Sequence, residues 1–415
     1  MLSDKRFIKT LQLQNLLSFG PDTLPIELRA LNVLIGPNGS GKSNLLEAID
    51  LLRASATDLT APIRAGGGAA DLLWKGAASK PVAELNATFH YPSGSKLAYQ
   101  IEPMSLRHRL YFSTIGQSFE MIDEAVENER KEYEQAPDVR FFYRYQRGRP
   151  VLSVKAIDDN GAAGGSERRD RQLRREDLAP DQSVLSQRRD PDQYPEITYL
   201  GNCYKQIKLY REWDLGRNTP PRLPQTVDLP NDFLAEDASN LALVLNYLTH
   251  RGDTKNILLA QLELFYDQVT DFSTLLQGGT VQVFFHEKNL LQPVPATRLS
   301  DGTLRFLCLA SILCHPSPPP LICIEEPEIG LHPDILPIIA EMLVQASQRT
   351  QVVVTTHSDT LVDALSQVPE AVLVCEKESN ATTVRRLDQD ALSKWLKEYS
   401  LGELWRSGEL GGNRW

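Results

Sequence analysis

Residues 34–44 read LIGPNGSGKSN, an apolar run followed by three glycines, a lysine and a serine. Residues 30–35, which lead into the glycines, are apolar enough to predict a short buried strand. Residues 36–43 match the pattern G-x-x-x-x-G-K-[ST] at every fixed position, and residues 44–52 are apolar at helical spacing. A strand, a glycine-rich loop and a helix in this order predict a loop that binds the phosphates of a nucleotide.

The residue types of this loop suit phosphate binding. Glycines let backbone N–H groups turn inward to a phosphate chain, and the start of the following helix adds partial positive charge. Lys42 would reach the β- and γ-phosphates, and the hydroxyl of Ser43 would bind Mg²⁺. An ordinary glycine and serine turn is the alternative, which the agreement between motif and context disfavours. The expected contacts of ATP are Gly36, Pro37, Asn38, Gly39, Ser40, Gly41, Lys42, Ser43 and Asn44.

Three later stretches narrow the class of nucleotide-binding protein. Residues 299–305, LSDGTLR, open an apolar helical pattern, and residues 320–327, PLICIEEP, read as a buried strand ending in two carboxylates. Residues 351–358, QVVVTTHS, read as a third strand, which ends in a histidine. A phosphate loop followed by these three stretches in this order resembles the ABC-type ATPase heads.

This resemblance implies a role for each motif. Ser300, Asp301 and Gly302 would form the signature, Glu325 would be the acid on the metal side where the family usually has Asp, and Glu326 would be the general base. His357 would be the switch histidine, and Gln187 is a candidate for the glutamine that helps to bind the metal. Each feature also has a simpler interpretation: an ordinary turn at residues 300–302, solvated carboxylates at a strand end, and a capping or core histidine.

In ABC-type heads the signature of one subunit faces the γ-phosphate bound by the other. A chain with one phosphate loop and one signature therefore implies a homodimer with two ATP molecules between the subunits. Ser300 and the helix that it begins would donate to the γ-phosphate in trans. Lys42, Glu326 and His357 would act in catalysis, with Glu326 orienting or deprotonating the attacking water. ATP hydrolysis would then open the dimer.

The long insert between Ser43 and Ser300, about 257 residues, is unlike that of a transporter ATPase. No heptad pattern runs beyond a few turns, which excludes long coiled-coil arms. We expect an α/β fold: an ABC-type ATPase head with a P-loop mixed sheet, flanking helices and an antiparallel β subdomain, plus a helical lobe that carries the signature. The predicted parts are residues 1–105, the first half of the head; 106–295, the insert and helical lobe; and 296–415, the second half of the head.

Within the insert, alternating patterns predict strands at residues 82–91 and 96–102 and a hairpin from 141–145 and 151–154. Residues 119–130 read as one acidic helix and residues 158–182 as a mobile polar loop. From residue 232 the pattern turns helical, at residues 240–248 and 255–269. After His357 we expect strands at 371–376 and 382–387 and an amphipathic helix at 388–399. The glycine-rich tail, residues 402–415, predicts no helix around Trp405 and Trp415, and it would either dock on the head or bind a partner.

The composition bounds the location and the partners. The chain has 415 residues, 41% hydrophobic and 24% charged, with a formal charge of −10. It shows no apolar run long enough for a membrane helix and no signal peptide, so we expect a cytoplasmic protein. Its five cysteines form no CxxC pair and predict buried thiols.

A local excess of basic residues raises the question of DNA. Residues 140–190 contain 12 Lys and Arg and 8 Asp and Glu, a net of +4. In residues 140–149 the arginines alternate with aromatic residues, which suits the backbone and bases of DNA. A solvated loop beside the outer face of a strand is the alternative, and we favour it slightly.

Residues 190–213, 234–248 and 400–415 also resemble, together with GPNGSGKSN and EEPEIGLHP, the compact RecF/SMC-like ATPases of the AAA_21 group. Related ATPases of the OLD, Septu and PARIS types serve in anti-phage defence, with a fused or a separately encoded nuclease. A fused Toprim nuclease would need roughly 100 residues after His357, and 58 follow it. The resemblance thus implies a separate effector, a nuclease or a toxin.

Three functions remain open at this point. The chain is an ATP-driven sensor in genome defence that acts through a partner effector, a RecF-like DNA repair ATPase that acts on DNA ends or gaps, or a nucleotide-dependent scaffold with negligible hydrolysis. The replacement of the usual Asp by Glu325 motivates the third hypothesis.

Overall fold

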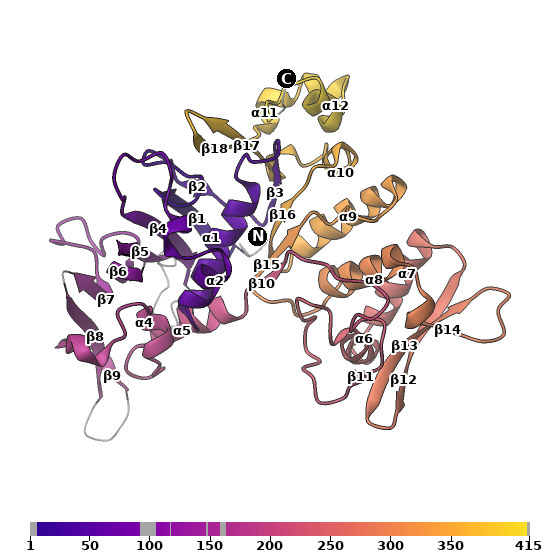
Figure 1. Ribbon diagram of the computed structural model, residues 1–415, viewed down its shortest axis with the longest axis horizontal. Coiled ribbons are helices and arrows are strands. Elements are labelled where there is room, and N and C mark those ends of the chain that lie inside the picture. The colour runs from indigo at the N-terminus through magenta and orange to yellow at the C-terminus, as the bar shows by residue number, and fades with distance from the viewer. Residues whose placement is uncertain (1–5, 92–104, 117, 147, 158–162, 413–415) are drawn as a thin grey trace.

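The computed structural model describes residues 6–91, 105–116, 118–146, 148–157 and 163–412 (Figure 1). Its centre is a six-stranded sheet in the order β10-β15-β16-β3-β17-β18, in which all neighbours are parallel except β17 and β18. The strands are β3 (Leu31–Ile35), β10 (Lys208–Tyr210), β15 (Leu321–Glu325), β16 (Gln351–Thr355), β17 (Val372–Glu378) and β18 (Ala381–Arg386). The predicted strands of the phosphate loop, the two glutamates and the histidine are therefore neighbours.

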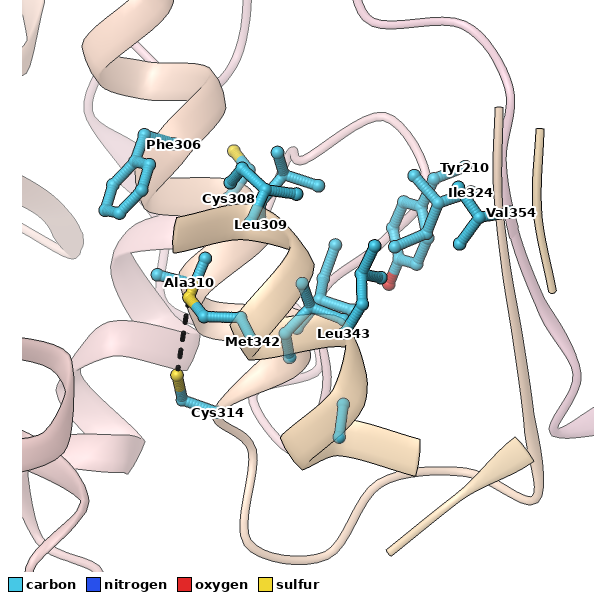
Figure 2. Packing of buried hydrophobic residues seen from close by; sticks show 14 of the residues in the cluster. Tyr210, Phe306, Cys308, Leu309, Ala310, Cys314, Ile324, Met342, Leu343 and Val354 are labelled. Atoms are coloured by element: carbon cyan, nitrogen blue, oxygen red, sulfur yellow. Dashed lines mark hydrogen bonds between the residues drawn. The ribbon is translucent and has the colours of Figure 1, made fainter. Parts of the chain in front are cut away.

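Helices cover both faces of this sheet, as its apolar strands require. In β3, Val33 and Ile35 pack on one face with α8 (Asp301–Leu313) and α9 (Leu336–Ser347), whereas Leu34 packs on the other face with α1 (Lys42–Ser55). Figure 2 shows the first of these cores, where Leu343 of α9 lies between α8 and the strand residues Ile324 and Val354. Two buried cores thus hold the central sheet in place.

An eight-stranded antiparallel sheet extends from one side of the head (Figure 1). Its order is β2-β1-β4-β5-β6-β7-β8-β9, and helices α4 (Val184–Gln187) and α5 (Pro195–Lys205) pack near it and α1. The strands are β1 (Ile8–Gln14), β2 (Ile26–Glu27), β4 (Ala83–His90), β5 (Ser105–Ile115), β6 (Ser118–Asn128), β7 (Phe141–Gln146), β8 (Arg149–Ile157) and β9 (Ala163–Gln172). The predicted division at residue 105 stays a prediction, and it falls where β5 begins inside this sheet.

Two predictions about the insert are wrong. The acidic helix expected at 119–130 is strand β6, which pairs with β5 from Ser118 to Asn128. The polar loop expected at 158–182 contains strand β9, which pairs with β8. In both cases pairing with a neighbouring strand outweighs local composition. The strand predicted at 96–102 and residues 158–162 lie outside the described residues.

A second body, residues 214–314, lies on the opposite side of the central sheet, and we call it the signature lobe (Figure 1). Its predicted helices are present as α6 (Leu241–Thr249) and α7 (Thr254–Phe265), and they lead to α8. The lobe also contains an antiparallel sheet in which β13 pairs with three strands. These strands, which the sequence did not reveal, are β11 (Gln225–Thr226), β12 (Val269–Gln277), β13 (Thr280–Glu287) and β14 (Val294–Pro295).

The C-terminal region corrects two further predictions. The helix expected at 388–399 is interrupted: α11 (Gln389–Leu392) is followed by a single 3₁₀ turn at residues 395–397. Trp405 does lie in a helix, α12 (Leu401–Arg406), because Ser400 and Glu403 form a capping box at its start. The Trp405 side chain is buried against the head, so residues 400–412 are docked.

The remaining helices are short. They are α2 (Thr60–Ala65), α3 (Ala69–Leu72) and α10 (Asp359–Asp363). In the part of the chain that the structure describes, no helix combines the length and the apolar character needed to cross a bilayer. All five cysteines are free thiols, and four of them are buried, as the sequence predicts.

Candidate functional site

The phosphate loop spans the gap between β3 and α1, and its glycines are required by close packing. Gly36 has φ of 147°, and a Cβ atom there would lie 2.2 Å from the carbonyl oxygen of Cys375. Gly41 has φ of 102°, and a Cβ atom there would lie 2.2 Å from Oγ1 of Thr382. Both positions therefore accept only glycine, and the loop is held tightly against β17 and β18.

Lys42 and Ser40 fit an anionic ligand at this loop. Lys42 Nζ donates to the carbonyl oxygens of Gly36 at 2.8 Å and Pro37 at 3.2 Å. Burial lowers the pKa of Lys42, an effect that nearby groups such as Cys375 and Glu326 oppose. The hydroxyl of Ser40 is buried and has no hydrogen-bond partner among the described residues. A phosphate oxygen would satisfy this hydroxyl and give Lys42 its counter-charge.

Two segments far from the loop in sequence support it, and the sequence did not reveal them. Ser18 accepts a hydrogen bond from Asn44 Nδ2 at 2.7 Å and another from Thr382 Oγ1 at 2.7 Å. Thr382 Oγ1 also lies 2.9 Å from the carbonyl oxygen of Ser40. Asn44, which was predicted to contact the nucleotide, thus uses its side-chain amide to anchor the loop.

Glu325 lies at the end of β15, and the structure brings it to Ser43 as predicted. The Ser43 hydroxyl donates to one oxygen of Glu325, and Nε of Arg211 donates to the other at 3.0 Å. A hydroxyl and one carboxylate suit Mg²⁺, which takes few protein ligands and completes its shell with phosphate and water oxygens. In the described ranges, no group of three or more His, Cys, Asp or Glu side chains is arranged to hold a metal ion.

Glu325 also lines an acidic cleft of ≈ 780 Å³ between α1 and the segment that leads into the signature lobe. A cleft with this charge concentrates cations beside Ser43. Its charged lining consists of Glu47, Asp50, Arg53, Arg211, Glu212, Asp214, Glu236, Asp237 and Glu325.

Glu326 and His357 face each other at the ends of β15 and β16. His357 Nε2 lies 3.5 Å from a carboxylate oxygen of Glu326, and both side chains are about one-third exposed. Glu326 has φ of 47°, which is unfavourable for a side chain with Cβ and is fixed by the hydrogen bond from its N–H to the carbonyl of Thr355. This turn aims the carboxylate away from the strand and toward the histidine.

Glu328 is a site residue to which the sequence motifs gave no role of its own. One of its oxygens accepts from Thr356 Oγ1 at 2.7 Å and from the backbone N–H of His357 at 2.8 Å. Glu328 therefore joins the two strand ends that carry Glu326 and His357. A third carboxylate in EEPE, one residue past the proline, was the available signal.

The predicted metal ligand Gln187 lies elsewhere. Its side-chain amide bonds the backbone of Ala179, Gln182 and Ser183. Gln182 of this loop bonds Leu59 just beyond the C-terminal end of α1, whereas Ser43 is in the first turn of this 14-residue helix, which is about 20 Å long. The structure therefore does not bring Gln187 to Ser43 or Glu325. Arg211, the residue after β10, reaches Glu325 instead, as a hydrogen-bond donor and not as a metal ligand.

The signature residues lie at the start of α8. Ser300 is the N-cap, and its hydroxyl accepts from the N–H of Thr303 at 3.0 Å. Asp301 is exposed and forms an ion pair with the buried Arg222, which also donates to the carbonyl of Leu299. A Cβ atom at Gly302 would lie 2.9 Å from the carbonyl oxygen of Gly330, so the signature packs on the loop that follows Glu328.

Comparison with known proteins agrees with this geometry. The family model described as "AAA domain, putative AbiEii toxin, Type IV TA system" matches residues 31–363. The chain belongs to the AAA_21 family of ATPase domains. It is a P-loop ATPase domain, and this family implies nucleotide binding. The family resemblance inferred from the motifs is confirmed.

A curated relative and two solved structures extend this result. The Old nuclease of Escherichia phage P2 is 27% identical over 192 residues, covering 39% of this chain and 32% of that protein. The chain thus spans about a third of the length of this relative. One solved structure, an Smc head bound to the C-winged helix domain of ScpA, is 15% identical to this chain with a TM-score of 0.55. Another is an Smc head with an extended coiled coil, bound to the C-terminal domain of ScpA derived from Pyrococcus furiosus. It is 14% identical with a TM-score of 0.53. In both comparisons the match covers 94% of this chain and 99% of the chain in the solved structure. This likeness confirms the predicted head fold.

Proposed function

We propose that this protein is an ATPase that dimerises head to head around two ATP molecules and acts as a switch for a separate effector in anti-phage defence. The observation that carries the enzymatic part is the convergence at one edge of the central sheet. The ends of β3, β15 and β16 bring together Ser43, Glu325, Glu326 and His357 with the phosphate loop. We call this set the P-loop edge.

The residues of the P-loop edge divide the work of hydrolysis. The backbone N–H groups of residues 38–43 and the side chain of Lys42 bind the phosphates. Mg²⁺, held by Ser43 and Glu325, would neutralise charge that develops on them. Glu326 accepts a proton from the attacking water or orients it, and its 3.5 Å contact with His357 keeps the carboxylate aimed.

The signature supplies the argument for a dimer. Ser300 and the N–H groups that begin the 13-residue helix α8 are donors for an anion. They lie on the signature lobe, whereas Lys42 and Ser43 start a helix of the head. A second copy that presents its signature to this phosphate loop completes the set of donors around the γ-phosphate, which makes dimerisation depend on ATP.

The proposed defence role is supported by the matched family, whose description refers to the AbiEii toxin of a type IV toxin–antitoxin system, and by the likeness to the Old nuclease. Because the chain covers 32% of that relative, the nuclease activity itself is not transferred to this protein. Nuclease or toxin chemistry would come from a partner. Co-purification with the products of adjacent genes, with and without ATP, tests this part.

The contacts of the basic segment, residues 140–149, weaken the argument for the DNA repair alternative. Arg140 pairs with Glu132 at 2.7 Å, and Arg144 pairs with Glu127 and Asp138. Arg144 also lies over the ring of Phe141. These carboxylates compete with a phosphate backbone for the arginines, and Arg147 lies outside the described residues.

Light scattering on the purified chain tests the dimer. With Mg²⁺ and a nonhydrolysable ATP analogue we expect twice the mass that is found without nucleotide, and replacing Ser300 with Arg, which puts bulk and charge at the signature, should keep the mass at one chain. A wild-type protein that binds the analogue and stays monomeric would contradict the proposal. Phosphate release by the wild type separates it from the scaffold hypothesis.

A further inference from the structure

The junction between the signature helix and the P-loop edge contains two buried polar atoms that lack partners. Arg305 lies one turn beyond Gly302 in α8, is 7% exposed, and its Nη1 has no hydrogen-bond partner among the described residues. Oε2 of Glu328 also lacks a hydrogen-bond partner among the described residues. The other oxygen, Oε1, accepts from Thr356 Oγ1 and from the backbone N–H of His357. Leaving a buried donor and a buried acceptor unpaired costs free energy, so each needs an explanation.

The two atoms belong to one packed junction. The Gly302 position of α8 lies against the carbonyl of Gly330, which follows Glu328 by two residues. Arg305 is on the same side of α8, three residues after Gly302. The charge of Glu328 is among those that act on the pKa of Arg305, which burial lowers. The free donor and the free acceptor therefore belong to the same junction, and no hydrogen bond joins them in this structure.

An aromatic side chain holds the guanidinium of Arg305 at this junction. Its central carbon lies 5.3 Å from the ring centre of Trp213, and Trp213 stacks in turn on Tyr210 at 5.5 Å. Trp213 lies two residues after Arg211, which bonds Glu325. A planar guanidinium can keep its ring contact and still form a new hydrogen bond at its edge, which an ammonium cannot do as well.

We propose that Arg305 is a positioning residue that forms an ion pair with Glu328 when the signature lobe closes on ATP. Nη1 of Arg305 donates to Oε2 of Glu328 in the closed state, while the guanidinium stays on Trp213. Because Glu328 holds the backbone of His357, this bond ties the position of the signature helix to that of the histidine and of Glu326. Hydrolysis then proceeds fastest only when the signature is engaged. The inference rests on the proposed ATP-dependent dimer.

A double-mutant cycle tests this bond. Glu328→Gln keeps one oxygen for Thr356 and the N–H of His357 and removes the second acceptor, and Arg305→Gln removes the donor. The steady-state kcat and KM for ATP are measured for both variants and for the double variant, together with thermal unfolding without nucleotide. Arg251→Gln is the matched control, because Arg251 also lies over a ring, that of Tyr247 in the same lobe.

We expect each single variant to lower kcat about tenfold, as for one charged hydrogen bond, with KM within about twofold. The double variant should be no slower than the slower single variant, while the shifts in unfolding temperature without nucleotide add. Arg305→Lys should restore only part of kcat, and Arg251→Gln should leave it unchanged. These results would support the bond.

Two outcomes would overturn the inference. If the losses in kcat multiply, or if the coupling is already present in unfolding without nucleotide, Arg305 and Glu328 do not form a bond specific to the closed state. If the wild type neither dimerises with ATP nor hydrolyses it, the proposed function fails and the closed state falls with it. A wild type that does both, with uncoupled variants, refutes only the role of Arg305.

Discussion

The P-loop edge and the signature lobe carry the two halves of the proposed site in different ways. At the P-loop edge, the groups are fixed by parallel strands and by buried contacts, such as those of Gly36 and Gly41 with β17 and β18. The signature is held inside its own lobe by Arg222, which bonds the carbonyl of Leu299 and Asp301. The proposed catalytic residues thus lie in one body, and the signature that would complete the site lies in the other.

The link between the two bodies on the side of the metal site is polar. Arg53 of α1 pairs with Glu236 of the signature lobe, and Arg211, in the segment that leads into this lobe, pairs with Glu325. Ion pairs with partly exposed side chains contribute little stability, about 0–1 kcal/mol each, and can be exchanged when a nucleotide adds charge. The contrast teaches that the apolar cores fix the fold, whereas polar contacts at this border are suited to adjust the lobe.

Glu326→Gln should have the largest effect, because it acts on chemistry at the P-loop edge alone. Removing a general base costs roughly 10²–10⁴ in rate. We expect phosphate release to fall at least about 100-fold while ATP-dependent dimerisation persists. Glu341→Gln, an exposed position on α9, is the control. Hydrolysis by Glu326→Gln at the wild-type rate would show that another group is the base.

Gly302→Ala should have the next largest effect, because it acts on the contact between the two bodies. The new methyl group would lie 2.9 Å from the carbonyl oxygen of Gly330, so α8 and the loop must separate. Overpacking of this kind costs about 1–3 kcal/mol. We expect the ATPase rate to fall about tenfold, which corresponds to about 1.4 kcal/mol. We expect ATP binding to change by less than about twofold.

The matched control is Gly201→Ala in α5, where the added Cβ would lie 3.3 Å from the carbonyl of Leu185. Its ATPase rate should stay near that of the wild type. Equal losses in the two variants would attribute the effect of Gly302→Ala to general destabilisation. Nucleotide binding is measured with a fluorescent ATP analogue.

The same contrast explains what could be predicted from the sequence. The P-loop edge was predictable because its chemistry needs fixed residue types at fixed spacing, as in residues 36–43, and because buried parallel strands read as apolar runs. Glu326 and His357 follow such runs directly. Their contact at 3.5 Å is a consequence of neighbouring strands, β15 and β16.

The border residues could not be found in this way. Arg211 reaches Glu325 because β10 pairs with β15, a pairing between segments more than 100 residues apart that no local pattern encodes. Gln187 was chosen by residue type and lies at the wrong end of α1. Strand β6 was mistaken for a helix because its pairing partner β5, rather than its acidic composition, decides its conformation.

Arg211→Gln should have a smaller effect, on the metal dependence of the polar link. The guanidinium occupies one oxygen of Glu325, and its charge opposes a divalent cation at the other. We expect the Mg²⁺ concentration for half-maximal ATPase to fall about threefold, because partly exposed charges interact by about 1 kcal/mol or less. Arg53→Gln, in the same cleft but without contact to Glu325, should leave this concentration unchanged.

A higher Mg²⁺ requirement in Arg211→Gln would reverse this interpretation. Arg211 would then act chiefly by orienting the carboxylate, and the loss of orientation would outweigh the relief of repulsion. Titration of Mg²⁺ at saturating ATP separates the two cases. The rate at saturating Mg²⁺ shows in addition whether Glu325 still reaches Ser43.

The smallest expected effect is the pH dependence that His357 confers on the P-loop edge. Burial lowers the pKa of His357 from 6.5, and Lys42 lowers it further, while Glu326 and Glu328 oppose the shift. The ring therefore gains its proton only as the pH falls below 6.5, and the neutral form is present above that value. Between pH 7.5 and 6.5, kcat/KM for ATP should change by less than about twofold.

Below pH 6.5, kcat/KM of the wild type should fall along an acid limb. This limb should be lost in His357→Gln and retained in His250→Gln, because His250 is an exposed histidine of the signature lobe. An acid limb that begins above pH 6.5, or one that persists in His357→Gln, would mean that a different group orients the Glu326 carboxylate.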